Sequence, residues 1–578
     1  MAKKEQNKTP TKKAAASITA SSTAEYFSKN LQQVGFSSPT KAVLTTLKEA
    51  LDNSLDACEE HGILPEIKVL IEKKGAGSLK NTDQIRICVQ DNGPGIDVAD
   101  LPKVFGEYLA SSKFGRGRCT RGQQGIGISA ATTWALQTSA TGAKVITKTK
   151  GQRKATSCMI EIDLKNNKGI LKNKDTIDWA PDHGTRVEFL IDGRIQTNGE
   201  AGLLSYLRGT VLVNPHLTLD YKLPDGEEAK IDRVSDIIPD IPAATEPHPH
   251  TMKLGEFMAH SKFYGKVKVR NWLVNGFSRL TDGVLAEVAK SQKLSPKLYD
   301  KALDSLGDEE FKALYSALQN GELRAPSTQS VLSVGEDALA KSIKRLGEVD
   351  FFSVMSRKPA ICDFKPVQVE VAIARFLDSG MDPDDPVQVL RFANRVPLQF
   401  DKAACAIVKS INTVNWRSYG LRQPKDSLPL GSYILAVSVV SPFIKFKNAS
   451  KETIDASDEL VEEIRRALMQ AGQRLSRHIR KESREADLEE RIQHIEQFGP
   501  MLVDGLVRIT GSNDERKKRA EDGLRKILGR DAKDAIEQLE SANVDLEKQV
   551  QKEKKKRGSN SSDAQEESED GEKDTERE

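Results

Sequence analysis

The chain has 578 residues, which is too long for one hydrophobic core and predicts three or four domains of about 100 to 200 residues each. Its formal net charge of +3 is close to neutral, so composition alone does not indicate a nucleic-acid partner. No apolar run approaches the roughly 18 residues that span a bilayer, and the N-terminus has no signal-peptide pattern. The six cysteines are scattered without a C-x-x-C pair, which argues against a zinc site or a disulfide framework. We therefore expect a cytoplasmic protein with no membrane contact.

The two ends of the chain are polar and differ in charge. The N-terminus, MAKKEQNKTPTKK, is basic, and the C-terminus, SNSSDAQEESEDGEKDTERE, is acidic. Segments this poor in apolar residues do not bury enough surface to fold. Disorder is therefore predicted for residues 1–24 and 556–578.

The first folded region, 25–235, mixes helical and strand patterns. Helices are predicted at 40–61, 101–112 and 126–136, and strands at 66–73, 84–91, 144–150, 156–164 and 185–191. The strands do not alternate regularly with helices. This order predicts an α/β sandwich, in which one mixed sheet carries helices on one face.

Three further regions follow. A proline-rich linker leads into a helical module within 236–328, whose basic segment MAHSKFYGKVKVRNWLVNGF suits DNA phosphate contact and plain packing equally well. A second mixed domain is predicted at 329–480, with strands at 366–376 and 432–440 and a long helix beginning near Ala456. Residues 481–555 form a charged helical extension. The fold class is therefore α/β (α+β) with a helical C-terminal region.

The first candidate site motif is LKEALDNSLDACEEHG, which carries Glu49 and Asn53 on a mostly apolar helix. Residues four apart share a helix face, so the carboxylate and the amide project together. This pattern suits a polar site at the edge of a core. A solvated charge beside a helix amide is the alternative.

The second motif is QDNGPGI, in which Asp91 ends a strand and Gly93 and Gly95 form a turn. Glycines at such a turn allow a close approach of the backbone to another group. An ordinary Asp-Asn-Gly turn is the alternative. A tight Gly-Thr turn at Gly184 and Thr185 begins a later strand.

The third motif is RGQQGIGIS (121–129), a glycine-rich loop that runs directly into a helix. Backbone N–H groups at a helix N-terminus bind phosphate, and the preceding basic residues Lys113, Arg116, Arg118 and Arg121 add positive charge. A flexible loop that binds nothing is the alternative. The loop is neither a Walker A sequence nor a dinucleotide fingerprint, because its glycine order and context differ from both.

In this order, the motifs resemble the four nucleotide-binding motifs of the GHKL ATPase superfamily, which have the Bergerat fold. Within that superfamily, ALDNSLDACEEHGILPEI, the SSKF at 111–114, RGQQGIGISAA, VNPHLTL (213–219) and SPFIKFKNASKETI (441–454) resemble the topoisomerase VI B-subunit family. The resemblance covers roughly residues 25–480.

The resemblance implies a role for each motif residue. Glu49 matches the glutamate that activates the attacking water, and Asn53 matches the Mg²⁺ ligand. Asp91 matches the aspartate that accepts a hydrogen bond from the adenine amino group, with Thr185 nearby. The remaining predicted nucleotide contacts are Gly93, Gly95, Ser112, Lys113, Gly122, Gln123, Gln124, Gly125, Ile126, Gly127, Ile128 and Ser129.

The second mixed domain resembles the family's transducer, which has a ribosomal S5-like fold and carries a lysine that senses the γ-phosphate. The family pattern S-T-K-I-P-[FY]-K-x-x-G-K-E aligns Lys451 with that switch lysine, and Lys445 and Lys447 compete with it. The helical module stands where the family has a helix-two-turn-helix domain. The resemblance implies the domain limits 25–235 (ATPase), 236–328 and 329–480. Composition and charge add 1–24 (basic segment or strap), 481–555 and 556–578.

The implied function is that of the ATP-hydrolysing subunit of a type IIB DNA topoisomerase. Its implied cofactors are ATP and Mg²⁺. Its implied partners are an A subunit in an A2B2 heterotetramer, a second copy of the chain and double-stranded DNA. A clamp ATPase of the Hsp90-like chaperone or mismatch-repair kind is the alternative.

Overall fold

The computed structural model describes residues 21–110, 117–122, 125–242, 244–377, 380–448, 450–511 and 513–526. The chain divides into two compact units, Met1–Leu475 and Ser476–Glu578. The predicted disordered tail at 556–578 and most of the N-terminal segment lie outside the described residues. Among the described helices, none combines the length and the apolar character needed to cross a membrane.

The first unit opens with an eight-stranded sheet in the order β5-β4-β3-β6-β2-β1-β7-β8. The β1–β7 pair is parallel and the other neighbouring pairs are antiparallel. The strands are β1 (Glu66–Ala76), β2 (Asp83–Gln90), β3 (Ala143–Lys148), β4 (Ala155–Asp163), β5 (Lys168–Ile177), β6 (Gly184–Gly193), β7 (Thr218–Lys222) and β8 (Glu228–Ile231). The five predicted strands are present. The sequence missed β5, because all of its side chains are exposed or half-exposed and give no apolar alternation, and it also missed the short strands β7 and β8.

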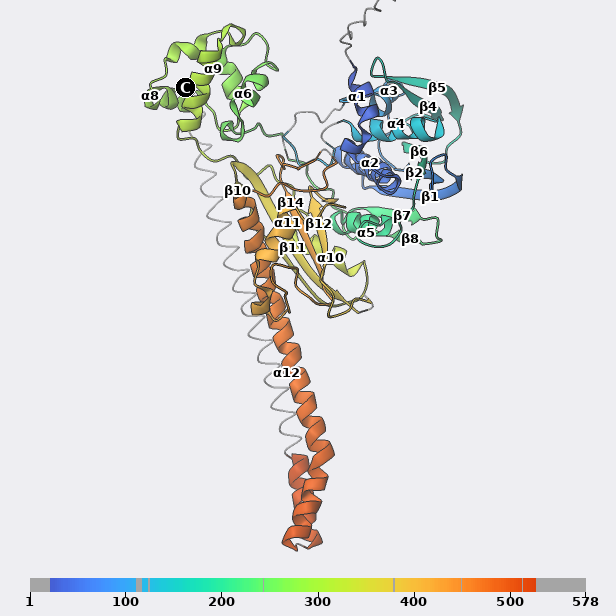
Figure 1. Ribbon diagram of the computed structural model, residues 1–578, viewed down its shortest axis with the longest axis vertical. Helices are drawn as coiled ribbons and strands as arrows, with labels where there is room; N and C mark the ends of the chain where they lie inside the picture. The colour runs from blue at the N-terminus through green and yellow to red at the C-terminus, as the bar shows by residue number, and fades with distance from the viewer. Residues whose placement is uncertain are drawn as a thin grey trace, which may run out of the picture. The chain divides into compact units, whose positions relative to one another are not determined.

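Helices cover one face of this sheet, as the sequence predicts (Figure 1). They are α1 (Thr23–Lys29), α2 (Pro39–Glu60), α3 (Leu101–Gly106), α4 (Gly127–Ser139) and α5 (Leu203–Val213), with a 3-10 turn at Leu31–Val34. Ser38 caps α2 by accepting a hydrogen bond from the Lys41 N–H at 3.2 Å, and Pro39 follows as the first helical residue. The buried side of α2 then packs on α4 and on β2 and β6.

The prediction of a helix over 101–112 is wrong at residues 107–110, and residues 111 and 112 lie outside the described residues. The helix α3 ends at Gly106, where an added Cβ would lie 2.4 Å from the Gly169 Cα of β5. Leu109 has a φ of 61°, which no helix tolerates. The chain therefore turns away from the helix before it reaches the glycine-rich loop.

A helical module with its own core follows the first sheet. It contains α6 (Leu254–Ser261), α7 (Val269–Gly276), α8 (Asp282–Ser291) and α9 (Asp308–Asn320), with 3-10 turns at Pro249–Thr251, Pro296–Asp300 and Leu303–Ser305. Phe257, Trp272 and Leu314 lie at the centre of the core. No strand occurs among the described residues of this module, as its pattern predicts.

The second α/β domain is built on a six-stranded sheet in the order β10-β11-β14-β12-β13, with β9 also paired to β11. Its strands are β9 (Val349–Ser356), β10 (Ala360–Cys362), β11 (Lys365–Phe376), β12 (Gln388–Ala393), β13 (Val396–Pro397) and β14 (Ile434–Val440). Its helices are α10 (Glu336–Lys344), α11 (Ala406–Thr413) and α12 (Asp458–Thr510), with a 3-10 turn at Trp416–Tyr419. The two strands and the long helix that the sequence predicts are all present.

Helix α5 joins the two sheet domains of the first unit. Tyr206 and Leu207 belong to the core of the first sheet. Leu212 and Val213, one to two turns later, pack in a second core with residues of the second α/β domain such as Phe392. A displacement of either domain therefore acts on the same helix.

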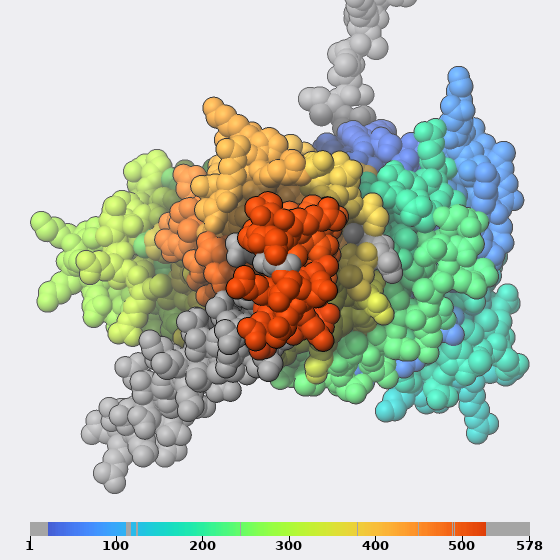
Figure 2. Space-filling model, turned by 90° about the horizontal axis from the view of Figure 1, so that it is seen from below, coloured from blue at the N-terminus to red at the C-terminus, as the bar shows by residue number. Residues whose placement is uncertain are grey.

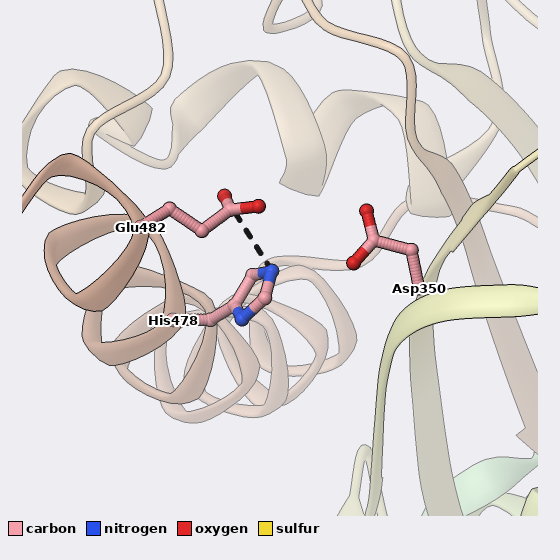
Figure 3. A group of neighbouring side chains, drawn as sticks. All are labelled: Asp350, His478 and Glu482. Carbon is pink, nitrogen blue, oxygen red and sulfur yellow. Dashed lines mark ion pairs between the residues drawn. The ribbon is translucent and has the colours of Figure 1, made fainter. Parts of the chain in front are cut away.

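The second unit is helical as far as it is described. Its residues continue α12 and then form a helix over 514–526, whose Leu524 packs on Gly499 and whose Lys517 lies 2.6 Å from the Asp504 carboxylate. His478 and Glu482, one turn apart on α12, form an ion pair at 3.5 Å (Figure 3). The end of α12 (orange-red in Figure 2) exposes five large apolar side chains: Phe498, Met501, Leu502, Leu506 and Ile509.

Candidate nucleotide-binding site

One cavity of about 330 Å³ brings together motifs that are far apart in the sequence. Its walls come from α2, the turn after β2, the glycine-rich loop before α4, and two loops of the second α/β domain. The predicted site residues that line it are Glu49, Asn53, Gly95, Gly122, Gly125, Ile126, Gly127, Ile128 and Lys451. The cavity is thus shared between two domains of the first unit.

Glu49 lies directly against the start of α4. A Cβ added to Gly127, the first residue of α4, would lie 1.9 Å from the Glu49 Oε2 atom. Only glycine lets the carboxylate approach the helix N-terminus this closely. Glu49 is therefore held between its own helix and the end of the glycine-rich loop.

Replacement of Gly127 by alanine is expected to slow ATP hydrolysis about a hundredfold, because the added methyl group must displace Glu49 and a misplacement of about 1 Å costs that much. Steady-state hydrolysis by the purified chain measures the effect. Gly255→Ala is the matched control, because Gly255 also lies at a helix start and an added Cβ meets nothing within 4 Å. Equal rates for both variants would contradict this account of Gly127.

Asn53 lies one turn after Glu49, and its amide oxygen faces the glycine-rich loop. A Cβ built on Gly122 would lie 3.6 Å from the Asn53 Oδ1 atom. An amide oxygen beside a phosphate-binding loop is a suitable ligand for Mg²⁺, which prefers hard oxygen donors and keeps several of its waters. The donor set therefore fits the predicted metal.

Asp91 is buried at the end of β2 and is held by three donors. Its Oδ1 accepts hydrogen bonds from the Gly93 N–H at 2.9 Å and the Thr185 N–H at 3.0 Å, and its Oδ2 accepts one from the Ser54 hydroxyl at 2.8 Å. Burial raises the pKa of Asp91, while these three hydrogen bonds oppose the rise. The second and fourth motifs therefore meet at this carboxylate.

Gly95 and Gly184 make this junction possible. Gly95 has a φ of 77°, and an added Cβ would lie 2.3 Å from the Lys148 carbonyl oxygen. Gly184 has a φ of 136°, and its Cβ would lie 2.2 Å from the Asp91 carbonyl oxygen. Both positions need a residue without a side chain.

Other predicted contacts are placed differently or lie outside the described residues. Ser129 is buried and donates its hydroxyl hydrogen bond to the Glu107 carbonyl at 2.8 Å, so its side chain does not line the cavity. Ser112, Lys113, Gln123 and Gln124 lie outside the described residues.

Lys451 reaches this cavity from the second α/β domain. Its ammonium group donates a hydrogen bond to the Arg121 carbonyl oxygen at 3.0 Å. Burial lowers the pKa of Lys451, and Glu49 opposes this change. The residue has a φ of 54°, a strained value for a side-chain-bearing residue that is often found at functional sites. Neither Lys445 nor Lys447 lines the cavity.

Two features of the site have no counterpart in the sequence prediction. Gln399 and Phe400 of the second domain also line the cavity. Lys41 on α2 forms an ion pair at 3.0 Å with Glu452, the residue after Lys451. No spacing in the sequence indicates either contact, because the residues are hundreds of positions apart.

The predicted role of Arg121 as a charge for the phosphates is wrong in this structure. Its guanidinium is buried against Asp56 at 2.7 Å and Glu59 at 2.7 Å. The sequence did not single out either acid, because a carboxylate near a helix end is usually solvated.

Comparisons with known proteins show which family the chain belongs to. Residues 41–183 match the family model for histidine kinase-, DNA gyrase B-, and HSP90-like ATPases, and residues 326–491 match the model for the transducer of the topoisomerase VI B subunit. The B subunit of type 2 DNA topoisomerase 6 from Archaeoglobus fulgidus is 35% identical over 464 residues, which cover 80% of this chain and 75% of that protein. The corresponding protein of Pyrococcus abyssi is 30% identical over 544 residues, covering 86% of this chain and 93% of that protein.

The mixed sheet with helices on one face, and the cavity shared by Glu49, Asn53 and the glycine-rich loop, define an ATPase of the gyrase B and HSP90 class. The transducer model and the aligned relatives, which together span both domains, narrow this class to one family of topoisomerase subunits. The chain belongs to the family of type 2 DNA topoisomerase 6 B subunits, and its function is that of the ATP-driven component of a type II topoisomerase.

Proposed function

We propose that this chain is the ATP-operated gate of an A2B2 topoisomerase that passes one DNA duplex through another. The observation that carries the proposal is that Lys451 of the transducer and Glu49 of the ATPase domain line one cavity. A nucleotide bound there contacts both domains. Its binding and loss therefore change the contacts between them.

In the proposed reaction, Glu49 accepts the proton of the attacking water. The Gly127 contact holds its carboxylate in place, and a fixed general base contributes about 10² to 10⁴ in rate. Asn53 holds Mg²⁺, which neutralises charge on the phosphate oxygens when it is bound. Backbone N–H groups at the start of α4 receive the phosphates.

Asp91 is proposed to select adenine, because its carboxylate accepts but does not donate hydrogen bonds. Asp91→Asn is expected to raise the dissociation constant for ATP at least tenfold, because a hydrogen bond to a charged group contributes about 1.5 to 3 kcal/mol. Binding of a fluorescent ATP analogue measures the loss. Ser54→Ala removes only a hydrogen bond to the same carboxylate and should weaken binding less. An Asn variant that binds ATP normally would contradict the assignment.

Lys451 is proposed to bind the γ-phosphate in place of the Arg121 carbonyl oxygen. A compact ammonium group on a flexible stem suits the sensing of a phosphate that is present in one state and absent in the other. The transducer then moves with Lys451 and drives the DNA-cleaving A subunit.

Dimerisation with a second copy on ATP binding, contact with double-stranded DNA and a cytoplasmic location complete the proposal. The six cysteines, all free and buried, fit a reducing compartment.

The proposal is tested with the full chain, its candidate A subunit and plasmid DNA. Supercoiled plasmid should be relaxed only when ATP, Mg²⁺ and both subunits are present, and DNA should raise the rate of ATP hydrolysis. The chain without the A subunit should hydrolyse ATP but relax no plasmid. Hydrolysis that ignores DNA but responds to unfolded protein would instead favour the chaperone-type clamp.

A further inference from the structure

A buried charge network joins the glycine-rich loop to the transducer at a place outside the nucleotide cavity. Its centre is Glu59, in the last turn of α2, with a side chain 1% exposed. Glu59 accepts hydrogen bonds from both terminal nitrogens of Arg121 at 3.0 and 2.7 Å, and from both terminal nitrogens of Arg395 at 3.2 and 2.6 Å. The His216 ring adds a contact at 2.8 Å.

Arg121 connects this network to the switch lysine. The side chain of Arg121 binds Asp56 and Glu59, whereas its carbonyl oxygen accepts the hydrogen bond from Lys451. A displacement of the Lys451 ammonium group therefore removes a contact from the residue that also holds Glu59. Arg121 is the first residue of the glycine-rich loop, so both contacts act at one end of the phosphate-binding segment.

Arg395 reaches the network from the transducer at a cost in backbone strain. It lies in the two-residue turn between β12 and β13, where Asn394 has a φ of 48° and Arg395 a φ of 62°. Turns of this type favour glycine at the second position, and an arginine there is strained by about 1 kcal/mol or more. Asn214, at the end of α5, binds Arg121 through its oxygen and the Arg395 carbonyl through its nitrogen. Asn394 is held within the second domain by hydrogen bonds with Ser441, whereas the Arg395 side chain and carbonyl are held by Glu59 and Asn214, which both also bind Arg121.

The charges of the network are balanced. Two guanidinium groups face the carboxylates of Asp56 and Glu59, and burial lowers the pKa of His216, which keeps that ring neutral. Burial alone would raise the pKa of Glu59, but Arg121 and Arg395 lower it well below its usual range. A bidentate carboxylate shared by two arginines has a narrow range of allowed geometry. Movement of one arginine is therefore transmitted to the other.

We propose that Arg121, Glu59 and Arg395 form a relay that couples the glycine-rich loop to the transducer in parallel with Lys451. Arg395 is a positioning residue in this relay, because it does not line the nucleotide cavity. The inference rests on the proposed function for its biological meaning. The relay should affect how the ATPase domain and the transducer rearrange when nucleotide binds. This rearrangement can be measured without DNA.

The test uses the full chain with cysteines introduced at the exposed positions Lys80 of the ATPase domain and Lys425 of the transducer for a fluorescent donor and acceptor. All six native cysteines are buried, which favours labelling at the introduced sites.

A non-hydrolysable ATP analogue should change energy transfer in the parent chain. Arg395→Gln should reduce that change by at least about half, because the contact between Lys451 and Arg121 remains, while KM and kcat for ATP hydrolysis stay within about threefold. In the holoenzyme, the number of strand passages per ATP should fall about tenfold, in the range of ordinary coupling energies.

Two further variants keep the test decisive. Lys402→Gln breaks an exposed ion pair between the transducer and Glu200 of the ATPase domain and should behave as the parent chain. Glu59→Gln combined with Arg395→Gln restores charge balance, so it should fold stably yet keep the reduced change in energy transfer. Normal energy transfer in Arg395→Gln, or recovery of coupling in the double variant, would overturn the relay. Hydrolysis and a normal nucleotide response without strand passage by the parent holoenzyme would instead overturn the proposed function.

Discussion

Glu49→Gln is expected to reduce ATP hydrolysis by about 10² to 10⁴-fold while ATP binding stays within a few fold of the parent chain. Glutamine keeps the size of the side chain and its place beside Gly127. It lacks the basic oxygen that takes a proton from water. The expected loss is therefore in kcat rather than in the dissociation constant for ATP, and single-turnover hydrolysis with an independent binding assay separates the two.

The matched control for this variant is Glu60→Gln. Glu60 also lines the cavity from α2, but it lies about two turns after Asn53, and the side chain that faces Gly127 is Glu49. Its hydrolysis rate should stay within about threefold of the parent rate. Equal losses for Glu49→Gln and Glu60→Gln would show that the negative charge of the cavity matters rather than a base at one position.

The motifs of the candidate site could be recognised in the sequence because their residue patterns are local. Glu49 and Asn53 are four residues apart on one helix, and Asp91 and Gly93 share one turn. The glycine-rich loop is followed directly by α4, which supplies the helix N-terminus that phosphate binding requires. Local spacing of this kind survives in the fold, since it depends on the helix and the turn rather than on distant contacts.

The limits of α3 and the direction of the Arg121 side chain could not be predicted in this way. Helix α3 ends where Gly106 lies against β5, a strand whose polar sequence gives no periodic signal, and where the backbone becomes extended at Glu107. Arg121 turns away from the cavity because Glu59 and Asn214 converge on it from α2 and α5. Both outcomes depend on tertiary contacts, which a single sequence does not reveal.

The identity of the switch lysine could be predicted only in part from the sequence. Alignment to the family pattern favours it, although Pro442, Lys445 and Ser450 depart from that pattern. In the structure, the strained backbone at Lys451 turns its side chain toward Arg121, whereas Lys445 lines a separate small cavity. The geometry therefore supports Lys451 as the lysine to test first.

Glu59→Gln alone is expected to destabilise the first unit by about 3 to 5 kcal/mol, because it leaves two buried guanidinium groups with too little negative charge. For a domain of the size of the ATPase domain, 25–235, each kcal/mol shifts the midpoint of thermal unfolding by about 2 to 4 °C. The midpoint should therefore fall by about 6 to 20 °C. Calorimetry on the full chain measures the shift. Glu228→Gln is the matched control, because Glu228 pairs with Lys222 at 2.7 Å on the surface and its loss should leave the midpoint unchanged.

The effect of Glu59 should also depend on pH. Because the arginines lower the pKa of Glu59 in the folded chain, its stabilising contribution is complete above its unfolded pKa of about 4.5 and is lost as the pH falls toward the folded value. The difference in stability between the parent chain and Glu59→Gln should therefore be constant from pH 7 to pH 5 and shrink below pH 4.5. A difference that stays constant through this acid range would mean that the carboxylate is not held charged by Arg121 and Arg395. In that case the network could not transmit force between the glycine-rich loop and the transducer.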